Sequence, residues 1–231
     1  MSEATAEPKQ HALQQVSGQA YGLEEVEPSD LSLPYLILTQ GLSKFVTQED
    51  HKVGVFVNTL SKKEFATVDF IPFKLSKYIN LLKPEGGKMV FEARATDDND
   101  PRLAGRRFFA EGKGDSRIAA NATSIIAILA LVNGEPAVIK FAKSGYKTGK
   151  DLLTMAKMSG GAFWSHKYQL GAKKETKGEN TFYVPTVKDL GATSEDEQAP
   201  AWAMYNNFAD KAKNVVDATQ DGEPYNEQEQ F

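Results

Sequence analysis

Basic and aromatic residues alternate closely in several segments of the sequence. Lysine and arginine neutralise the phosphates of a nucleic-acid backbone, and flat aromatic side chains stack on bases whose faces are free only in a single strand. The main candidates are Lys140, Lys143, Tyr146, Lys147, Lys150, Phe163, Trp164, His166, Lys167, Tyr168, Lys173, Lys174 and Lys177. The secondary candidates are Arg106, Arg107 and Phe108, together with Lys74, Lys77 and Tyr78. Both kinds of side chain in one place would suit binding of single-stranded nucleic acid without sequence preference.

An ordinary structural role is the alternative for each of these residues. Most of the 17 aromatic residues between positions 31 and 190 are expected in the core, and lysines in turns are commonly only solvated. As a strand, segment 163–170 would place Trp164, His166 and Tyr168 on one face, with Phe163 and Lys167 on the other. Only one of these faces can point to the core, and the sequence leaves open which.

Charge is distributed unevenly along the chain. Residues 31–190 contain 24 lysines and arginines against 16 acidic residues, whereas residues 1–30 contain one lysine and six acids. Residues 191–231 contain two lysines and nine acids. A basic body between two acidic ends indicates a polyanionic partner for the body. Acidic tails that merely keep the protein in solution are the alternative.

Motifs for catalysis, metal binding or cofactor binding are not found. The chain has no cysteine and three histidines, so thiolate metal sites, disulfides and cysteine nucleophiles are excluded. Residues 145–151 have three residues between their glycines, and Asp151 follows the lysine where a phosphate-binding loop has serine or threonine. We therefore expect no enzyme activity, no metal and no cofactor. Without a signal peptide or a long apolar run, we expect a cytoplasmic protein, in the host cytoplasm if it is viral.

The elements that must position the candidate residues are mostly strands. Strands are predicted over 53–60, 65–75, 89–95 and around 106–110, with Pro72 marking a bulge or an edge. The second half predicts the order strand, strand, short helix, strand, strand over 123–132, 137–143, 148–159, 162–173 and 181–188. Asn133-Gly134 forms the first hairpin turn, and Thr148 is the expected helix cap. The predicted fold is mainly β, an OB-like Greek-key barrel with added strands.

The two ends of the chain are assigned to separate regions. Residues 1–30 are expected to be a flexible acidic segment, and 31–190 the OB-like nucleic-acid-binding domain. Residues 191–216 are assigned to a linker and an amphipathic helix that starts at Pro200, with apolar residues at helical intervals. Residues 217–231 are expected to form an acidic disordered tail, whose removal should raise the affinity for single-stranded DNA at low salt.

The tail and the body each resemble known families. An acidic end that terminates in Phe231 resembles the tails of bacterial and phage single-stranded DNA-binding proteins, which recruit replication partners and compete with DNA. The resemblance implies partner binding by Phe231, Glu229 and Glu227. The stretches LPYLILTQGLS, GVFVNTL and FWSHKYQLGAKKETKGENTFYVPTV resemble tailed-phage OB-fold proteins that bind single-stranded DNA.

These resemblances imply single-stranded DNA binding in viral DNA replication, recombination or repair. The partners would be DNA and, through the tail, replication or recombination proteins; whether the protein is a monomer or a dimer stays open. One alternative is a non-catalytic phage structural or host-interaction protein without DNA binding. A second alternative is an enzyme of nucleic-acid metabolism whose site carries no recognisable motif.

Overall fold

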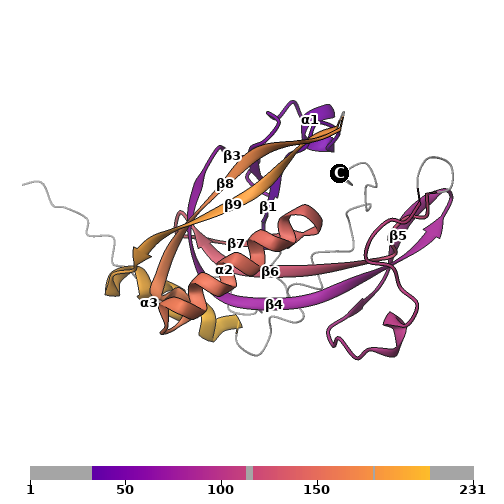
Figure 1. Cartoon of the computed structure of the whole chain (residues 1–231). Coiled ribbons are helices and arrows are strands. Elements are labelled where there is room, and N and C mark those ends of the chain that lie inside the picture. Colours follow the sequence, from indigo (N-terminus) through magenta and orange to yellow (C-terminus); the bar gives the residue numbers. More distant parts are fainter. Residues whose placement is uncertain (1–32, 113–116, 179, 209–231) are drawn as a thin grey trace, which may run out of the picture.

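The computed structural model describes residues 33–112, 117–178 and 180–208. The strands are β1 (Tyr35–Leu38), β2 (Phe56–Asn58), β3 (Glu64–Phe65), β4 (Val68–Glu85), β5 (Lys88–Ala95), β6 (Ala122–Val132), β7 (Glu135–Ala142), β8 (His166–Lys177) and β9 (Asn180–Ala192). The helices are α1 (Lys44–Thr47), α2 (Tyr146–Ser159) and α3 (Glu195–Phe208), with 3-10 turns η2 (Pro101–Leu103), η4 (Lys143–Gly145) and η5 (Phe163–Ser165). The fold is mainly β, as the sequence predicts (Figure 1).

The strand order is that of an OB-fold barrel. β4 pairs antiparallel with both β6 and β8, β6 pairs with β7, and β8 pairs with β9. α2 lies between β7 and β8 in the chain, the place of the helix between the third and fourth strands of an OB-fold. β1 adds to β7 in parallel and continues into β2 and β3. The predicted OB-like barrel with added strands is therefore confirmed.

The two largest hydrophobic cores among the described residues lie on opposite faces of the barrel strands. Because side chains alternate along a strand, Ile126 and Ile128 of β6 join the inner core. This core also contains Tyr168 of β8 and Leu152 of α2. Gly149 permits the close approach of α2 to the barrel, since a Cβ there would lie 2.7 Å from Phe141 Cβ.

The neighbouring residues of β6 point outward into the second core. Ile125 and Leu129 pack there with Phe73 of β4 and with Ala201 and Phe208 of α3. α3 thus packs on the outer face of β4 and contributes Ala201 and Phe208 to the second core.

The sheet is not closed by a backbone ladder within the described part of the chain, where its path ends at β3 and β9. The side chain of Gln40, which follows β1, bridges instead to β9. Its Nε2 donates to the Tyr183 carbonyl over 2.9 Å, and its Oε1 accepts from the Tyr183 amide over 2.9 Å. Gly54, at φ 80°, faces the Tyr183 ring so closely that a Cβ would meet it at 2.3 Å.

An insertion between the first two barrel strands extends from the body. We call residues 82–121 the insertion; it begins on the last part of β4, continues through β5, and returns to β6. Figure 1 shows β5 at the far end of the long β4 ribbon, away from α3. Arg106 fixes the insertion internally, because its guanidinium donates to the Leu82 carbonyl over 2.9 Å and pairs with Glu92 over 2.6 Å.

Several sequence predictions are confirmed in detail. The order of β6, β7, α2, β8 and β9 matches the prediction for the second half of the chain. Asn133 and Gly134 form the β6–β7 turn with φ of 49° and 86°, the positive values that make this dipeptide favourable there. The register of β4 against β6 shifts between Pro72 and Lys74, the bulge that the proline predicts.

Other predictions of element boundaries are wrong. α2 begins at Tyr146 with Gly145 as its cap, and the Thr148 hydroxyl donates instead to the Pro185 carbonyl of β9. The strand expected around 106–110 does not form, because this segment lies in the loops of the insertion.

The C-terminal helix also begins earlier than predicted. α3 starts at Glu195, because Ser194 and Glu197 form a capping box, and Pro200 lies inside the helix. The segments 1–30 and 217–231 assigned to the ends lie outside the described residues.

Candidate nucleic-acid interface

The first group of predicted residues lies around the start of α2. Lys147 and Lys150 are exposed on the outer face of the helix. Tyr146 packs partly against the inner core, so its ring contributes to the barrel. Lys140 of β7 lies over the ring of Tyr35, 3.9 Å from its centre, which holds this ammonium on the other side of the sheet. Of this group, the two α2 lysines are best placed to meet a polyanion.

Segment 163–168 is divided between the two cores. Phe163 packs against the inner core, whereas Trp164 packs against the outer core, with its ring centre 5.1 Å from that of Tyr205 in α3. Tyr168 is fully buried, and burial raises the pKa of its hydroxyl to about 12. The prediction that Tyr168 contacts nucleic acid is therefore wrong, because its ring has no surface to offer a base.

The expected alternation of faces fails in the same segment. Residues 163–165 form the turn η5, and the register of β8 against β9 shifts between Lys167 and Tyr168. A turn and a bulge both break the two-residue period. The two faces that the sequence predicts for this segment do not exist as such.

The polar residues of segment 163–168 pair with acidic residues of α3 and β9. Lys167 Nζ pairs with Glu197 Oε1 over 2.6 Å, and this hydrogen bond raises the pKa of Lys167 and lowers that of Glu197. His166 Nδ1 lies 3.1 Å from the carboxylate of Asp189. Burial opposes ionisation of Asp189, but hydrogen bonds from the Gly191 amide and from His166 lower its pKa overall. These residues have partners within the protein.

The β8–β9 hairpin contributes lysines of two kinds. Lys173 pairs with Glu175 over 2.6 Å, whereas Lys174 and Lys177 are exposed. Lys174 lies opposite Tyr183 and two residues beyond Ala172, which lies opposite Pro185. It therefore shares the hairpin face that meets the start of α2, where a Cβ on Gly145 would lie 2.9 Å from Pro185 Cγ.

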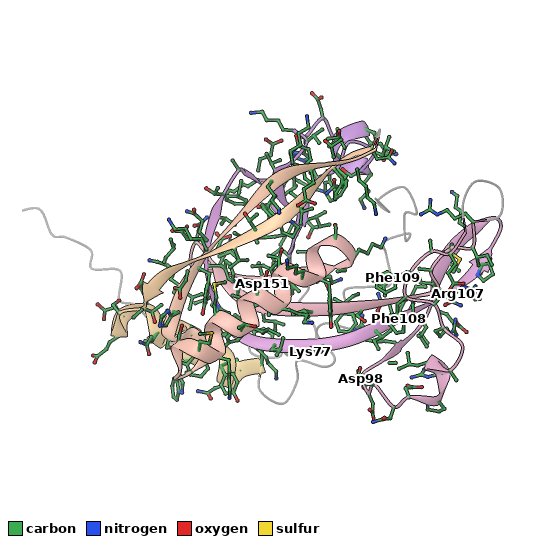
Figure 2. The ribbon with its side chains drawn as sticks, viewed as in Figure 1. Lys77, Asp98, Arg107, Phe108, Phe109 and Asp151 are labelled. Carbon is green, nitrogen blue, oxygen red and sulfur yellow. The ribbon has the colours of Figure 1, made fainter. Side chains whose placement is uncertain are left out.

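The insertion carries exposed aromatic rings beside an arginine. Phe109 is 81% exposed and Phe108 39%, and they follow Arg107 directly. The carbonyl of Arg107 accepts hydrogen bonds from the amides of Asn121 and Ala122, which fixes this loop against the start of β6. Figure 2 shows the two rings and Arg107 where the insertion meets the barrel strands. The sequence prediction missed Phe109, although it follows Phe108 in an unbroken RRFF run.

Lys77 lies on β4 between the insertion and α2. It is exposed on β4 and lies opposite Ile126, whose Cδ1 would be 3.2 Å from a Cβ on Gly149. Four residues further along β4, about 13 Å at the rise of a strand, Leu81 lies opposite Ala122, which bonds to Arg107. Lys77 therefore lies between α2 and the exposed rings, as Figure 2 shows.

Tyr78, a secondary candidate next to Lys77, is buried on the other face. The Arg94 guanidinium lies 4.0 Å from the centre of its ring. Burial raises the pKa of its hydroxyl. The prediction of nucleic-acid contact is wrong for Tyr78 for the same reason as for Tyr168.

The structure thus places some of the candidates along one side of the barrel. We call these residues the α2-side surface: Lys77, Arg107, Phe108, Phe109, Lys147, Lys150 and Lys174. The exposed Asp151, which follows Lys150 on α2, adds one acidic side chain beside these residues (Figure 2). In an OB-fold, nucleic acid is bound by the outer face of the second and third strands and by the loops that follow the first and fourth. Here α3 packs on the outer face of the neighbouring strand β4, and the two loops are the insertion and the β8–β9 hairpin.

Across residues 33–112, 117–178 and 180–208, no three histidine, aspartate or glutamate side chains are grouped as metal ligands. No helix in these ranges combines the length and the apolar character that crossing a bilayer requires. The partner-binding candidates Phe231, Glu229 and Glu227 lie outside the described residues.

Comparison with known proteins decides the family. A family model described as Pam3 phage gp34-like protein matches residues 2–222. The chain belongs to the Pam3 phage gp34-like family. The match spans both acidic ends and the basic body, and it identifies a bacteriophage protein. Neither the curated proteins nor the solved structures gave a match.

Proposed function

We propose that this gp34-like phage protein binds single-stranded DNA without sequence preference, in phage DNA replication, recombination or repair. The observation that carries the proposal is the exposed Phe108–Phe109 pair beside Arg107, in the OB-fold loop that follows the first strand. Exposed phenylalanines are unfavourable in water unless they have a partner, and unpaired bases are flat apolar partners.

The lysines of the α2-side surface support the same function. Lys77, Lys147, Lys150 and Lys174 are exposed on the side where the rings lie, and none of them has an ion-pair partner among the described residues. Cations of this kind attract a phosphate backbone and release its counterions on binding. The rings would then select single strands, because base faces are covered in a duplex.

The direct test is a binding titration with the full chain. Fluorescence anisotropy would follow a labelled dT oligomer and a duplex of the same length, each over a range of salt concentrations. We expect tighter binding of the single strand and an affinity that falls steeply with salt. Equal affinity for the duplex would contradict stacking by the rings. No binding at low salt would favour a phage structural or host-interaction protein.

Variants connect the titration to the surface. Phe109→Ala should weaken binding of the oligomer, whereas Trp202→Ala removes an exposed ring of α3, on the other face of the barrel, and should leave it unchanged. The far-ultraviolet circular dichroism of both variants should match that of the natural protein. A loss of affinity that is equal for both variants would contradict the placement of the site.

A further inference from the structure

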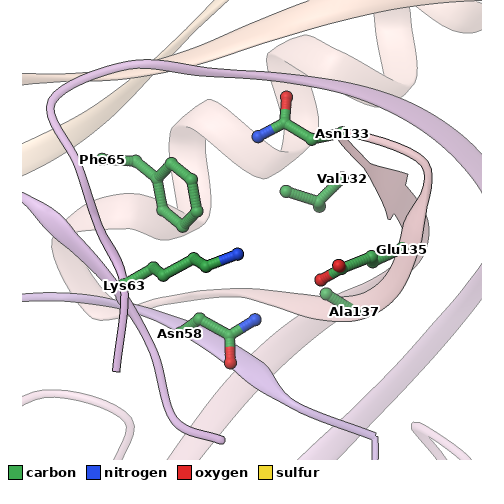
Figure 3. Close-up of a pocket in the computed structure, with 7 residues that line it drawn as sticks. All are labelled: Asn58, Lys63, Phe65, Val132, Asn133, Glu135 and Ala137. Atoms are coloured by element: carbon green, nitrogen blue, oxygen red, sulfur yellow. The ribbon is translucent and has the colours of Figure 1, made fainter. Parts of the chain in front are cut away.

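A small cavity lies at the end of the barrel away from the insertion. It has a volume of about 180 Å³ and is formed by the β2–β3 segment and the β6–β7 hairpin (Figure 3). Val132 and Ala137 supply apolar lining, and the ring of Phe65 forms one wall. The volume is below the roughly 300–1,000 Å³ of sites for drug-sized ligands. The cavity therefore suits one small ring system.

Four polar side chains line the same cavity. In Figure 3, the ammonium of Lys63 and the carboxylate of Glu135 point into it from opposite sides. Neither has an ion-pair partner among the described residues. Asn58 and Asn133 add two amides; Asn58 Oδ1 already accepts from the amides of Leu60 and Ser61, which leaves its NH₂ group available. A donor and an acceptor thus face each other across the gap.

We propose that this cavity binds a guanine base. Guanine presents two adjacent donor groups, N1–H and N2–H₂, and a carboxylate accepts two parallel N–H bonds. Its other acceptor edge carries N7 and O6, and the Lys63 ammonium, which enters the cavity from the side away from Glu135, donates to that edge. The flat ring packs against Phe65.

The other bases fit the same groups less well. Adenine and cytosine place an acceptor nitrogen beside their amino group, which repels the second oxygen of the Glu135 carboxylate. Thymine offers one N–H between two carbonyl oxygens. Guanine alone satisfies both carboxylate oxygens.

This site is separate from the proposed DNA surface. The cavity lies at the Val132 end of β6, and Arg107 lies at the Ala122 end, ten strand residues or roughly 30 Å away. The proposal therefore stands or falls independently of single-stranded DNA binding.

The test is a calorimetric titration of the full-length protein with guanosine, adenosine, cytidine and thymidine. We expect guanosine to bind at least about tenfold more tightly than the others, the discrimination of one bidentate contact. Glu135→Gln, which retains the shape of the side chain, should remove this preference, and Asn133→Gly, which retains the positive φ of the turn, should weaken binding.

Glu85→Gln, an exposed carboxylate outside the cavity, is the control and should bind guanosine like the natural protein. Thermal unfolding at the natural midpoint would show that each variant is folded. The proposal is overturned if guanosine does not bind at millimolar concentration, if adenosine binds equally well, or if folded Glu135→Gln keeps the preference.

Discussion

Segments 106–109 and 163–168 are similar in composition but differ in what they do. RRFF and FWSHKY each place aromatic rings directly beside cations. In 163–168 the rings enter two cores, and Lys167 pairs with Glu197 of α3. In 106–109 the guanidinium of Arg106 and the backbone of Arg107 are held internally, and the two phenylalanines face solvent. The difference arises because β8 is a barrel strand with neighbours on both faces, whereas the insertion lies beyond the barrel.

This comparison shows that the partner of a side chain cannot be inferred from its type. An aromatic ring next to a lysine is equally suited to the attachment of a helix and to the stacking of a base. What distinguishes the two segments is whether another element of the fold already covers the rings. Four predictions test this difference between the two segments.

The largest effect is expected in the buried segment. Tyr168→Ala removes a ring with 0% exposure from the inner core and should lower the free energy of unfolding by about 3–5 kcal/mol, which urea denaturation measures. Phe109→Ala, the matched change in the exposed segment, should alter it by no more than about 0.5 kcal/mol. Similar losses for both variants would show that the two segments have the same role.

The next effect concerns affinity rather than stability. Phe108→Ala and Phe109→Ala should each weaken binding of a dT oligomer by about 1–3 kcal/mol if each ring stacks on a base. The measurement is fluorescence anisotropy at fixed salt, with circular dichroism as the check on folding. Trp164→Phe retains an aromatic ring against Tyr205 and should bind DNA normally. Reduced affinity in Trp164→Phe alone would reverse the assignment of the two segments.

A smaller effect separates the exposed lysines from the paired one. Lys147→Gln and Lys174→Gln should each reduce the slope of log affinity against log salt by about 1, since each removes one phosphate contact. Lys167→Gln should leave the slope unchanged, because this ammonium already pairs with Glu197. A reduced slope in Lys167→Gln would place segment 163–168 on the DNA.

The smallest effect is a pH dependence of α3 packing. The pKa of Glu197 lies below its ordinary 4.5, so the stabilisation is complete above pH 4.5 and is lost as the pH falls through the lowered value. The pKa of Lys167 is raised above its ordinary 10.5, so its part is complete below pH 10.5 and is lost as the pH rises through the raised value.

Tryptophan fluorescence reports on this contact, because Trp164 packs on Tyr205 of α3. The signal should change at acidic pH in the natural protein and not in Glu197→Gln, while Glu195→Gln, an exposed neighbour, behaves like the natural protein. The amplitude is small because both side chains are about one-third exposed to solvent, which screens the pair. An unchanged acid transition in Glu197→Gln would contradict this origin.

Much of the fold could be predicted from local signals. The apolar run of β6, the Asn133-Gly134 turn and the bulge at Pro72 all depend on residues close together in the chain. The sequence also indicates the start of α3, since Ser194 and Glu197 have the spacing of a capping box. The predicted start at Pro200 rests on the preference of proline for the first helical turn instead. The bridge between Gln40 and β9 could not be predicted from local sequence, because Gln40 and Tyr183 are 143 residues apart.

The candidate site was less predictable than the fold for a related reason. Lys147, Lys150 and Lys174 are exposed as expected, since charged residues at the ends of elements are solvated. The positions of Tyr168 and Trp164 depend on η5 and on a register shift that β9 imposes on β8. The exposure of Phe109 depends on the position of the insertion outside the barrel. No local sequence pattern indicates that position.

The Gln40–Tyr183 contact joins β9 to the segment after β1 through a side chain instead of a backbone ladder. Elsewhere along the described sheet, neighbouring strands are joined by backbone ladders, in which several bonds must break together before two strands separate. At this one seam the joint is a side chain with rotatable bonds, and two hydrogen bonds hold it. Separating the β8–β9 hairpin from β1 therefore breaks these two hydrogen bonds and the packing of Tyr183 on Gly54, and it leaves every ladder intact.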